Sequence, residues 1–404
     1  MTRVLIIGGG IAGPAAAIAL QKTGIDAVIY EAHPGSAEGI GVFLTLGSNG
    51  IDALRTIGAD KTAMAAGFPT PGIMLRSNTG KHLGVSRIST SLPDGTTSHT
   101  LKRSDLYQVM RDEASSRGIR FEHGKRLVNA EETGGAVRAI FADGSEATGD
   151  LLIGSDGVHS AVRTVIDPNA PAPAYAGLVG LGGYARGVRV AEPCSYTMIF
   201  GKRAFFGYAV APDGEVWWFA NVPRRTEPAR GEMEAISGEE WRRRLIALFA
   251  DDAGPAVKLL EATSATDIMK ASPVHLMPHL PTWHRGRMVV LGDAAHAPSP
   301  SSGQGASLSI EDAVVLAKCL RDLPDYRQAY ARFEALRRPR VERIIKQAAR
   351  INNSKAAGPI VRIIRDAMLP VVLKLTAGSK QVQQMYGHHI DWSAPVADTA
   401  ARTA

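Results

Sequence analysis

The chain has 404 residues, of which 45% are hydrophobic and 21% are charged. These proportions are close to those of globular proteins, so they exclude a wholly disordered chain and a coiled coil, and the length predicts two or three domains. The two cysteines, Cys194 and Cys319, exclude a disulfide framework and a four-cysteine zinc site. They fit a reducing, cytoplasmic setting.

The formal net charge is +7, and most of it lies between residues 318 and 350. That predicted helical segment holds ten lysines and arginines against four acids. We interpret it as a helix face that is solvated or paired with acids, with nucleic-acid binding as the alternative. A known reader motif is absent from this segment of the sequence, so we expect no nucleic-acid partner.

No segment has the pattern of a targeting or membrane-spanning sequence. The N-terminal apolar run covers only residues 4–7, which is shorter than the apolar region of a signal peptide. The apolar stretch 367–377 has 11 residues and contains Pro370 and Lys374, whereas about 20 apolar residues are needed to cross a bilayer. We therefore expect a soluble protein without a transmembrane segment.

The first 31 residues have the pattern of a βαβ unit. Residues 4–7 form a continuous apolar run, typical of a parallel strand that is buried on both faces. The Ala-rich segment 11–23, which Gly24 follows, predicts a helix. Residues 27–30 predict a second strand that ends at Glu31, and two parallel strands need such a helical crossover.

Strands are again predicted for residues 73–99, where short polar and glycine-containing pieces follow one another. Residues 104–116 then predict a helix. The segments 137–141 and 146–153 flank Asp143-Gly144, a dipeptide typical of hairpin turns, so we expect these segments to form two strands.

A third strand-rich region follows, and seven of the 24 aromatic residues of the chain lie within its residues 200–219. Such a sheet could cover an apolar ligand, although an ordinary sheet core has the same composition. Because strand side chains alternate between two faces, we expect one face to line a substrate site. That face is predicted to carry Phe206, Tyr208 and Trp217, whereas Phe205 and Trp218 should face elsewhere.

Residues 288–291 predict a buried strand, and residues 306–320 predict a helix with early acids and late basic residues that suit its dipole. Further helices should run to about residue 392, with breaks at Gly358-Pro359 and at Pro370. The last residues, 393–404, are expected to form a flexible tail.

The first motif is a G-x-G-x-x-G sequence between the first strand and the first helix. It comprises Gly8, Gly10, Ile11, Ala12 and Gly13. Its glycines permit a tight turn, a close approach to a pyrophosphate and close packing of helix on strand, and the helix N-terminus favours the phosphates. Glu31 lies 18 residues beyond the last glycine, near the spacing expected for an acid that binds ribose hydroxyls. Together these features predict a dinucleotide site.

Two further motifs follow predicted strands. Asp156 lies in a Gly-Ser-Asp-Gly sequence that continues to Ser160 and Arg163, for which a simple turn is the alternative. Asp293 follows the strand 288–291 and could accept hydrogen bonds from sugar hydroxyls. After it, the glycine-rich loop 300–305 precedes a helix and would present N–H groups to negative charge, with a plain loop as the alternative.

The three motifs together resemble the group A flavoprotein monooxygenases, the p-hydroxybenzoate hydroxylase-like family, over residues 4 to about 350. In that family the first motif binds the ADP half of FAD, and the second takes part in handling both FAD and NAD(P)H. The resemblance therefore implies that Asp156 belongs to the cofactor site. It also implies that Asp293 binds the ribityl chain of the flavin and that Pro300 lies beside the ring.

The resemblance implies further cofactor contacts. The loop with Gly303 leads to backbone atoms that would reach the pyrimidine edge of the flavin, and these belong to Gly305, Ala306 and Ser307. Arg103 matches the family arginine that contacts FAD, and Leu127 lies where the family backbone often meets adenine. No catalytic side chain is implied, because the flavin carries the chemistry.

The sequence departs from several flavoprotein motifs, and these departures narrow the set of reactions that we expect. The family often has an arginine in the loop after the ribose-binding acid, but residues 36–39 contain none. The segment 218–223 half resembles the W-x-W-x-I-P of flavin halogenases, but Ala220 replaces the second tryptophan, which argues against halogenation. A second G-x-G-x-x-G and a C-x-x-C are absent from the sequence, so we expect no separate NAD(P)H domain and no dithiol relay. We also expect no metal site.

We predict a mixed α/β fold with a Rossmann-like FAD-binding domain, an inserted β-sheet substrate domain and C-terminal helices. The FAD-binding domain is expected to be discontinuous, with residues 1–72, 99–170 and 271–355. The substrate-binding sheet should comprise residues 73–98 and 171–270, followed by the C-terminal helices of residues 356–392 and by the tail.

The resemblance implies that NAD(P)H reduces FAD, that O2 forms a flavin hydroperoxide, and that its terminal oxygen passes to the substrate. That substrate is expected to be an electron-rich small molecule, aromatic or polyketide-like, which is hydroxylated or epoxidised. One alternative is an FAD-containing reductase of a prenyl or polyketide compound that does not use oxygen. Another is a redox-silent FAD-binding protein. Oxygen consumption with NADPH distinguishes all three.

Overall fold

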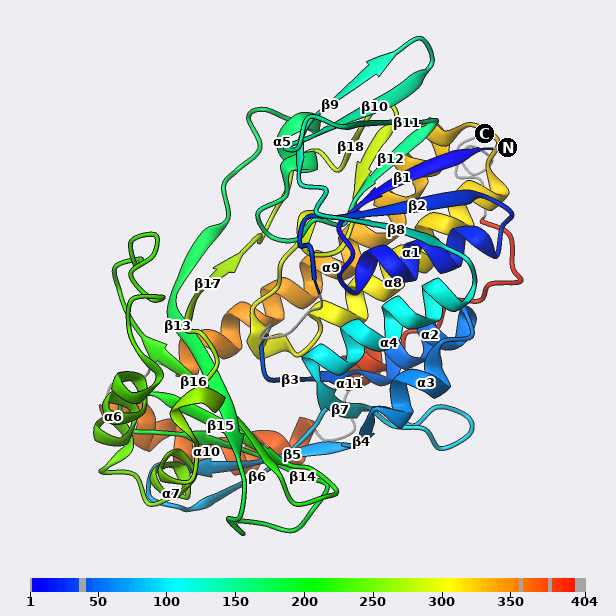
Figure 1. Ribbon diagram of the computed structural model, residues 1–404. Helices are drawn as coiled ribbons and strands as arrows, with labels where there is room; N and C mark the ends of the chain where they lie inside the picture. Colours follow the sequence, from blue (N-terminus) through cyan, green and yellow to red (C-terminus); the bar gives the residue numbers. More distant parts are fainter. Residues whose placement is uncertain (1, 36–40, 356–358, 377–379, 397–404) are drawn as a thin grey trace.

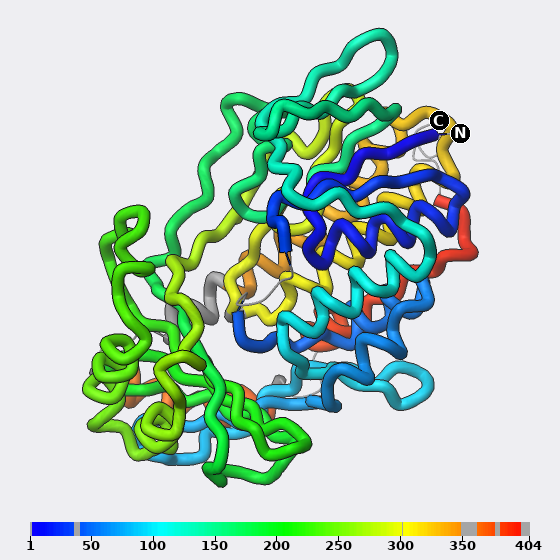
Figure 2. Tube along the Cα trace, viewed as in Figure 1, coloured from blue at the N-terminus to red at the C-terminus, as the bar shows by residue number. Residues whose placement is uncertain are grey.

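The computed structural model describes residues 2–35, 41–355, 359–376 and 380–396. The chain forms two lobes, one around a mainly parallel sheet and one around a mainly antiparallel sheet (Figure 1), and the path of the chain between them can be followed in Figure 2. The loop 36–39 that lacks an arginine, and residues 397–404 of the expected tail, lie outside the described residues.

The first lobe contains a six-stranded sheet in the order β18-β19-β12-β1-β2-β8. Its strands are β1 (Arg3–Ile7), β2 (Asp26–Glu31), β8 (Arg120–His123), β12 (Leu151–Gly154), β18 (His284–Arg285) and β19 (Met288–Val290). All neighbouring pairs are parallel except β18 with β19. The expected Rossmann-like arrangement is therefore present, because the buried apolar run of β1 lies in the middle of a parallel sheet.

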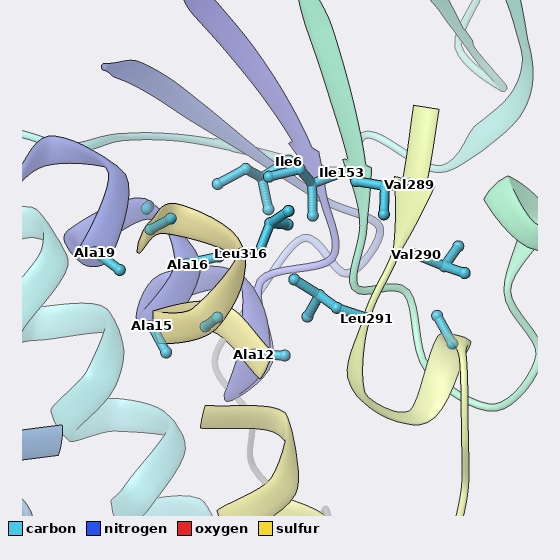
Figure 3. Packing of buried hydrophobic residues seen from close by; sticks show 14 of the residues in the cluster. Ile6, Ala12, Ala15, Ala16, Ala19, Ile153, Val289, Val290, Leu291 and Leu316 are labelled. Carbon is cyan, nitrogen blue, oxygen red and sulfur yellow. The ribbon is translucent and has the colours of Figure 1, made fainter. Parts of the chain in front are cut away.

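Helices α1 (Ala12–Gln21) and α8 (Gly305–Asp322) pack together beside this sheet. Figure 3 shows small side chains such as Ala15, Ala16 and Ala19 on α1, close to Leu316 of α8 and to Ile6 of β1. Alanine side chains let α1 approach its neighbours closely, so the helix is buried along nearly its whole length. This packing places the start of both helices at the ends of the strands.

Other elements complete this lobe. They are the helices α2 (Ser48–Thr56), α3 (Asp60–Ala65), α4 (Arg103–Ser116), α5 (Ala161–Ile166) and α9 (Tyr326–Lys355), and a three-stranded sheet of β9 (Leu127–Thr133), β10 (Ala136–Phe141) and β11 (Glu146–Gly149). The predicted strand 146–153 divides at Asp150 between β11 and β12, which belong to different sheets. Asp150 fixes the break, since its carboxylate accepts a hydrogen bond from the N–H of Arg3 at 2.7 Å.

The second lobe contains a seven-stranded sheet in the order β17-β13-β16-β15-β14-β5-β6. Its strands are β5 (Gly72–Ser77), β6 (His82–Arg87), β13 (Ala174–Ala185), β14 (Ser195–Phe200), β15 (Phe205–Val210), β16 (Val216–Pro223) and β17 (Ser272–Leu276). Strand β17 pairs with β13, so it belongs to this sheet although it lies beyond the boundary expected at residue 271.

The two faces of this sheet have different neighbours. Helices α6 (Gly238–Phe249) and α7 (Ala256–Glu261) cover one face. The other face packs against β3 (Phe43–Leu46) and β4 (Gly67–Pro69), which form a small sheet with β7 (His99–Lys102). This second face therefore adjoins the elements that carry Arg103.

The C-terminal helices are α10 (Pro359–Thr376) and α11 (Lys380–Tyr386). Pro370 lies inside α10, so the break expected there is wrong. Proline leaves the carbonyl four residues earlier without its helical partner, but here Lys81 donates its Nζ to that carbonyl, on Asp366, at 3.4 Å. Among the described residues, no helix has the length and apolar character needed to cross a membrane.

Candidate active site

The glycine motif forms the turn between β1 and α1. Gly8 has a φ of +106°, and a Cβ there would lie 2.5 Å from the carbonyl oxygen of Ser155. A Cβ on Gly13 would lie 2.0 Å from the carbonyl oxygen of Gly8. Both positions require glycine for these reasons. Ile11 and Ala12 follow at the start of α1, so the turn places closely packed backbone before a helix N-terminus, where phosphates bind well.

Glu31 ends β2 beside this turn. Its Oε2 accepts a hydrogen bond from the N–H of Gly9 at 2.7 Å, and its Oε1 accepts one from the N–H of His33 at 2.8 Å. The carboxylate thereby ties β2 to the glycine turn. Each oxygen can still accept a bond from a further donor such as a ribose hydroxyl, so the structure brings the predicted acid and the predicted turn together.

Asp156 has a local structural role. Its carboxylate accepts hydrogen bonds from the hydroxyl of Ser160 at 2.5 Å and from the N–H groups of Ala161 and Val162 at 2.8 and 3.1 Å. It therefore caps the start of α5. The same helix carries Arg163, which donates to the carbonyl of Ala294 at 3.0 Å. The motif thus supports the segment around Asp293, and a direct contact of Asp156 with the cofactor stays a prediction.

Asp293 and Arg103 bring opposite charges into the site. Asp293 lies in a short turn after β19, and burial raises the pKa of its carboxyl, while Arg103 and His296 act in the opposite direction. The pKa of Arg103 is raised by Tyr107 and by Asp293. The hydroxyl of Tyr107 lies 3.4 Å from Nη2 of Arg103. The Nε of Arg103 is buried and has no hydrogen-bond partner among the described residues. An oxygen-rich ligand would satisfy it.

The loop after Asp293 leads into the start of α8. Pro300 begins a short 3-10 turn, Gly303 has a φ of +60°, and α8 begins at Gly305. A Cβ on Gly305 would lie 3.8 Å from Oδ1 of Asp293, so the carboxylate and the helix start are neighbours. The N–H groups of Gly305, Ala306 and Ser307 belong to the first turn, where helical partners are lacking. They can therefore receive a negatively charged group.

Two predicted cofactor residues have further partners in the structure. The hydroxyl of Ser307 accepts a hydrogen bond from the N–H of Gly47 at 3.0 Å, so its side chain fixes α2 rather than facing a ligand. Leu127 is buried at the start of β9 and pairs with Phe141 of β10. The backbone contacts predicted for Ser307 and Leu127 with the cofactor stay predictions.

A buried ionic cluster lies behind this loop. The guanidinium of Arg337 contacts Glu311 and Asp312, both at 2.6 Å. Asp312 also accepts from the N–H of Gly292 at 2.9 Å and lies 2.5 Å from Nε2 of His296. The cluster therefore connects α8 and α9 with the turn that carries Asp293. His296 is therefore a structural member of this cluster.

Acidification should destabilise the fold through this cluster. Burial alone would raise the pKa of Glu311, but Arg337 and Arg340 lower it to about 2, below the ordinary value of 4.5. The stabilisation is therefore complete above the unfolded-state pKa and is lost as the pH falls through the range below it. Thermal unfolding at about pH 5 and about pH 3 should show a smaller pH-dependent loss for Glu311→Gln than for wild type. Equal losses in both proteins would contradict this assignment.

The aromatic residues of β15 and β16 lie on two faces of the sheet. Tyr208 pairs with Trp218 across the strands, and the ring of Phe206 stacks on that of Trp218 with 5.7 Å between centroids. Phe206 also contacts Phe249 of α6, whereas Trp217 lies on the opposite face. The expectation that Phe206, Tyr208 and Trp217 share one face is therefore wrong, because opposed residues of antiparallel strands share a face and neighbouring residues alternate.

The face with Trp217 also carries Phe205 and Phe219, so Phe205 does not face away from Trp217 as expected. Phe43 of β3 approaches this face, with ring centroids 6.1 Å from Trp217 and 5.7 Å from Phe219. The N–H of Arg103 donates to the carbonyl of the residue before Phe43 at 3.0 Å. This aromatic face, defined by Phe43, Phe205, Trp217 and Phe219, therefore adjoins the predicted cofactor residue Arg103.

Three charged residues belong to the edge of the aromatic face although no sequence motif marks them. Glu215 contacts Nζ of Lys102 and Nη2 of Arg186, each at 2.7 Å, and accepts a hydrogen bond from Nε1 of Trp217 at 2.8 Å. Burial alone would raise the pKa of Glu215, but the bonds from Lys102 and Trp217 lower it. The sequence holds one indication of this group: Lys102 is next to Arg103, and Glu215 lies two residues before Trp217.

The chain is similar in sequence to characterised oxygenases. A family model described as an FAD binding domain matches residues 1–348. Aurachin C monooxygenase/isomerase of Stigmatella aurantiaca is 31% identical over 353 residues, which cover 86% of this chain and 88% of the relative. An FAD-dependent urate hydroxylase of Klebsiella pneumoniae is 29% identical over 349 residues, with coverage of 86% and 88%.

The fold is similar to that of a solved flavoprotein. Klebsiella pneumoniae HpxO in complex with FAD and uric acid is 27% identical, has a TM-score of 0.80 and covers 96% of both chains. The expected fold class and the FAD cofactor are thereby confirmed, and NAD(P)H is the reductant typical of this family. The chain belongs to the FAD-binding-domain family of group A flavin monooxygenases, and it is an FAD-dependent monooxygenase of small molecules.

Proposed function

We propose that the protein uses NAD(P)H and O2 to hydroxylate an apolar aromatic small molecule held against the aromatic face. One observation carries this proposal: Trp217 and Phe219 contact Phe43, and the residue before Phe43 accepts a hydrogen bond from the backbone N–H of Arg103. An apolar aromatic surface thus adjoins the residues expected at the flavin. The charged group around Glu215 at its edge would bind a polar substituent of the substrate.

The described residues fit FAD in two groups. The glycine turn and Glu31 would hold the ADP half, and Arg103, Asp293 and the start of α8 would hold the flavin half. The chemistry that bound FAD supplies is the acceptance of two electrons from NAD(P)H and the insertion of one atom of O2, with the other atom leaving as water. The protein binds and orients the substrate, excludes water, and stabilises negative charge at the start of α8.

The reaction can be tested with holoenzyme and a library of aromatic compounds. Compounds that accelerate NAD(P)H oxidation are converted under isotope-labelled oxygen gas, and we expect one labelled oxygen atom in the product. A reductase would consume NAD(P)H without labelling the product, and a redox-silent protein would not consume it. Either result, or label that comes from water, would overturn the proposal.

We also propose a cytoplasmic location. Its support is that Cys194 and Cys319 are both free, with Cys194 exposed at the surface. Disulfides are rare in reducing compartments, where such exposed thiols persist. Labelling of Cys194 in intact cells by a thiol reagent that crosses membranes, but not by one that cannot, would support this location.

We expect Glu31→Ala to weaken FAD binding about 10- to 150-fold. The substitution removes the acceptor for Gly9 and for a ribose hydroxyl, and a hydrogen bond to a charged group is worth roughly 1.5–3 kcal/mol. Titration of apoprotein with FAD, followed by flavin fluorescence, measures the change. Glu31→Gln keeps one acceptor oxygen and should lose less. Unchanged affinity in Glu31→Ala would contradict the assignment.

A matched pair of substitutions separates the two faces of the sheet. The ring of Phe219 lies over Gly207 on the aromatic face, and Phe206 is fully buried under α6. We expect Phe219→Ala to raise KM for a true substrate about 2- to 10-fold, since a stacked ring is worth roughly 0.5–1.5 kcal/mol. Phe206→Ala should instead lower the free energy of unfolding by about 3–5 kcal/mol.

The two variants are compared by steady-state kinetics, FAD content and chemical denaturation. The proposed function requires that Phe219→Ala keep its FAD content and stability while KM rises. The same loss of stability in both variants would show that the aromatic face is core rather than a substrate surface.

A further inference from the structure

Helix α10 turns a continuous apolar stripe outward. Ile363 and Leu375 are 72% and 79% exposed, and Ile364, Met368 and Val371 are also exposed. These positions recur at helical spacing, so they form one face of the 18-residue helix. Single exposed apolar residues are common, but a contiguous stripe of large ones marks an interaction surface.

The opposite face of α10 packs against the protein. Arg365 places its guanidinium 4.3 Å from the ring centroid of Phe200, and Arg362 donates to the carbonyl of Lys202 at 2.8 Å. Leu373 packs over Gly84 of the edge strand β6. The helix lies along this end of the seven-stranded sheet in Figure 1. These contacts fix its rotation, so the outward position of the apolar stripe follows from its inward bonds.

The described part of the chain does not cover this stripe. The described residues leave it exposed, and the sequence segments outside the described residues contain only two large apolar side chains, Met1 and Ile40. A partner surface would bury it.

Charge identifies the kind of partner. The exposed Lys374 lies on α10, whereas the contacts of Arg362 and Arg365 turn these two arginines toward the protein. The exposed Lys81 and Lys380 lie beside it or just after it. An apolar stripe among basic residues suits the surface of an anionic bilayer, where the helix, about 27 Å long, would lie in the plane of the headgroups. A second copy of this chain would oppose the same cations with one another, which disfavours pairing.

We propose that α10 docks the protein on the surface of an anionic lipid bilayer, with Ile363, Met368 and Leu375 inserted among the acyl chains. The proposal stands on the outward stripe and its charge, and it does not depend on the substrate assigned above. Since α10 packs on the same sheet that bears the aromatic face, docking would bring that face close to compounds dissolved in the bilayer.

The test is co-sedimentation of the FAD-loaded protein with vesicles. Vesicles of phosphatidylcholine alone are compared with vesicles that also contain phosphatidylglycerol. We expect binding to the anionic vesicles, at least about tenfold weaker binding for the double variant Ile363→Asp with Leu375→Asp, and about fivefold weaker binding for Lys374→Ala. The matched control is Val128→Asp, because Val128 is 55% exposed on β9 of the other lobe; it should bind like wild type.

A change in vesicle binding can be distinguished from a loss of folding or of activity. All variants should keep wild-type FAD content and NAD(P)H oxidation, because the substituted side chains point outward. Absence of vesicle binding, or equal binding by the double variant, would overturn the proposal. A wild-type dimer in analytical ultracentrifugation that the double variant turns into a monomer would also overturn it, since a second copy would then cover the stripe.

Discussion

Replacing Arg337 by alanine should lower the free energy of unfolding by about 3–5 kcal/mol, because it leaves buried carboxylates without their counter-ion. Glu311 and Asp312 are fully buried, and Arg337 is 1% exposed. Arg340 still contacts Glu311 at 2.8 Å, but Asp312 would retain only His296 as a basic partner. Denaturant unfolding of the apoprotein measures the loss.

A control on the same helix is Arg327→Ala. The side chain of Arg327 is exposed and lies 3.9 Å from Asp325, and exposed pairs contribute at most about 1 kcal/mol. Arg337→Ala should also weaken FAD binding, because Asp312 holds the N–H of Gly292 beside Asp293. A stable Arg337→Ala protein would contradict the role given to the cluster.

Gly13→Ala should have the largest effect on the cofactor. Its Cβ would lie 2.0 Å from the carbonyl oxygen of Gly8, which is backbone and cannot rotate away. Overpacking of this kind costs about 1–3 kcal/mol, so FAD binding should weaken about 5- to 150-fold. The flavin absorbance of the purified protein and a titration of apoprotein with FAD measure this change.

The matched control is Gly35→Ala, just after β2. A Cβ on Gly35 meets no atom within 4 Å, so this variant should keep its flavin. Loss of flavin in both variants would indicate that alanine at any glycine of this region disturbs the fold, and the specific role of Gly13 would be rejected.

The sequence predicted the features that depend on local patterns. The βαβ unit up to Glu31 is local, because the glycine spacing and the apolar run lie within 31 residues. The acid-paired reading of residues 318–350 is confirmed for Arg337, Arg338 and Arg340, which contact carboxylates. That Arg337 is buried, however, depends on the packing of α9 on α8, which no local pattern reveals.

The features that depend on long-range pairing were less predictable. Alternation along a strand gives two sets of residues, but only the register with the next strand and the position of α6 decide which set faces α6 and which faces β3 and β4. For the same reason, the division at Asp150 required knowledge that β12 pairs with β1. Asp156 lies at the start of α5, where its carboxylate accepts a hydrogen bond from Ser160. This capping pattern is visible in the sequence, but the family resemblance led to a cofactor role for Asp156 instead.

The order of strands in the parallel sheet determines when the cofactor site can form during translation. Strand β1 is flanked by β2, which is made early, and by β12, which pairs in turn with β19. Asp293 leaves the ribosome 280 residues after Gly13, a delay of about 15–60 s at common elongation rates. Throughout this interval the apolar edge of β1 and the alanine-rich surface of α1 lack their final partners, which favours aggregation and recruits chaperones. The two groups of residues proposed to hold FAD can meet only late, so FAD bound there would stabilise the finished chain and would not protect the nascent one.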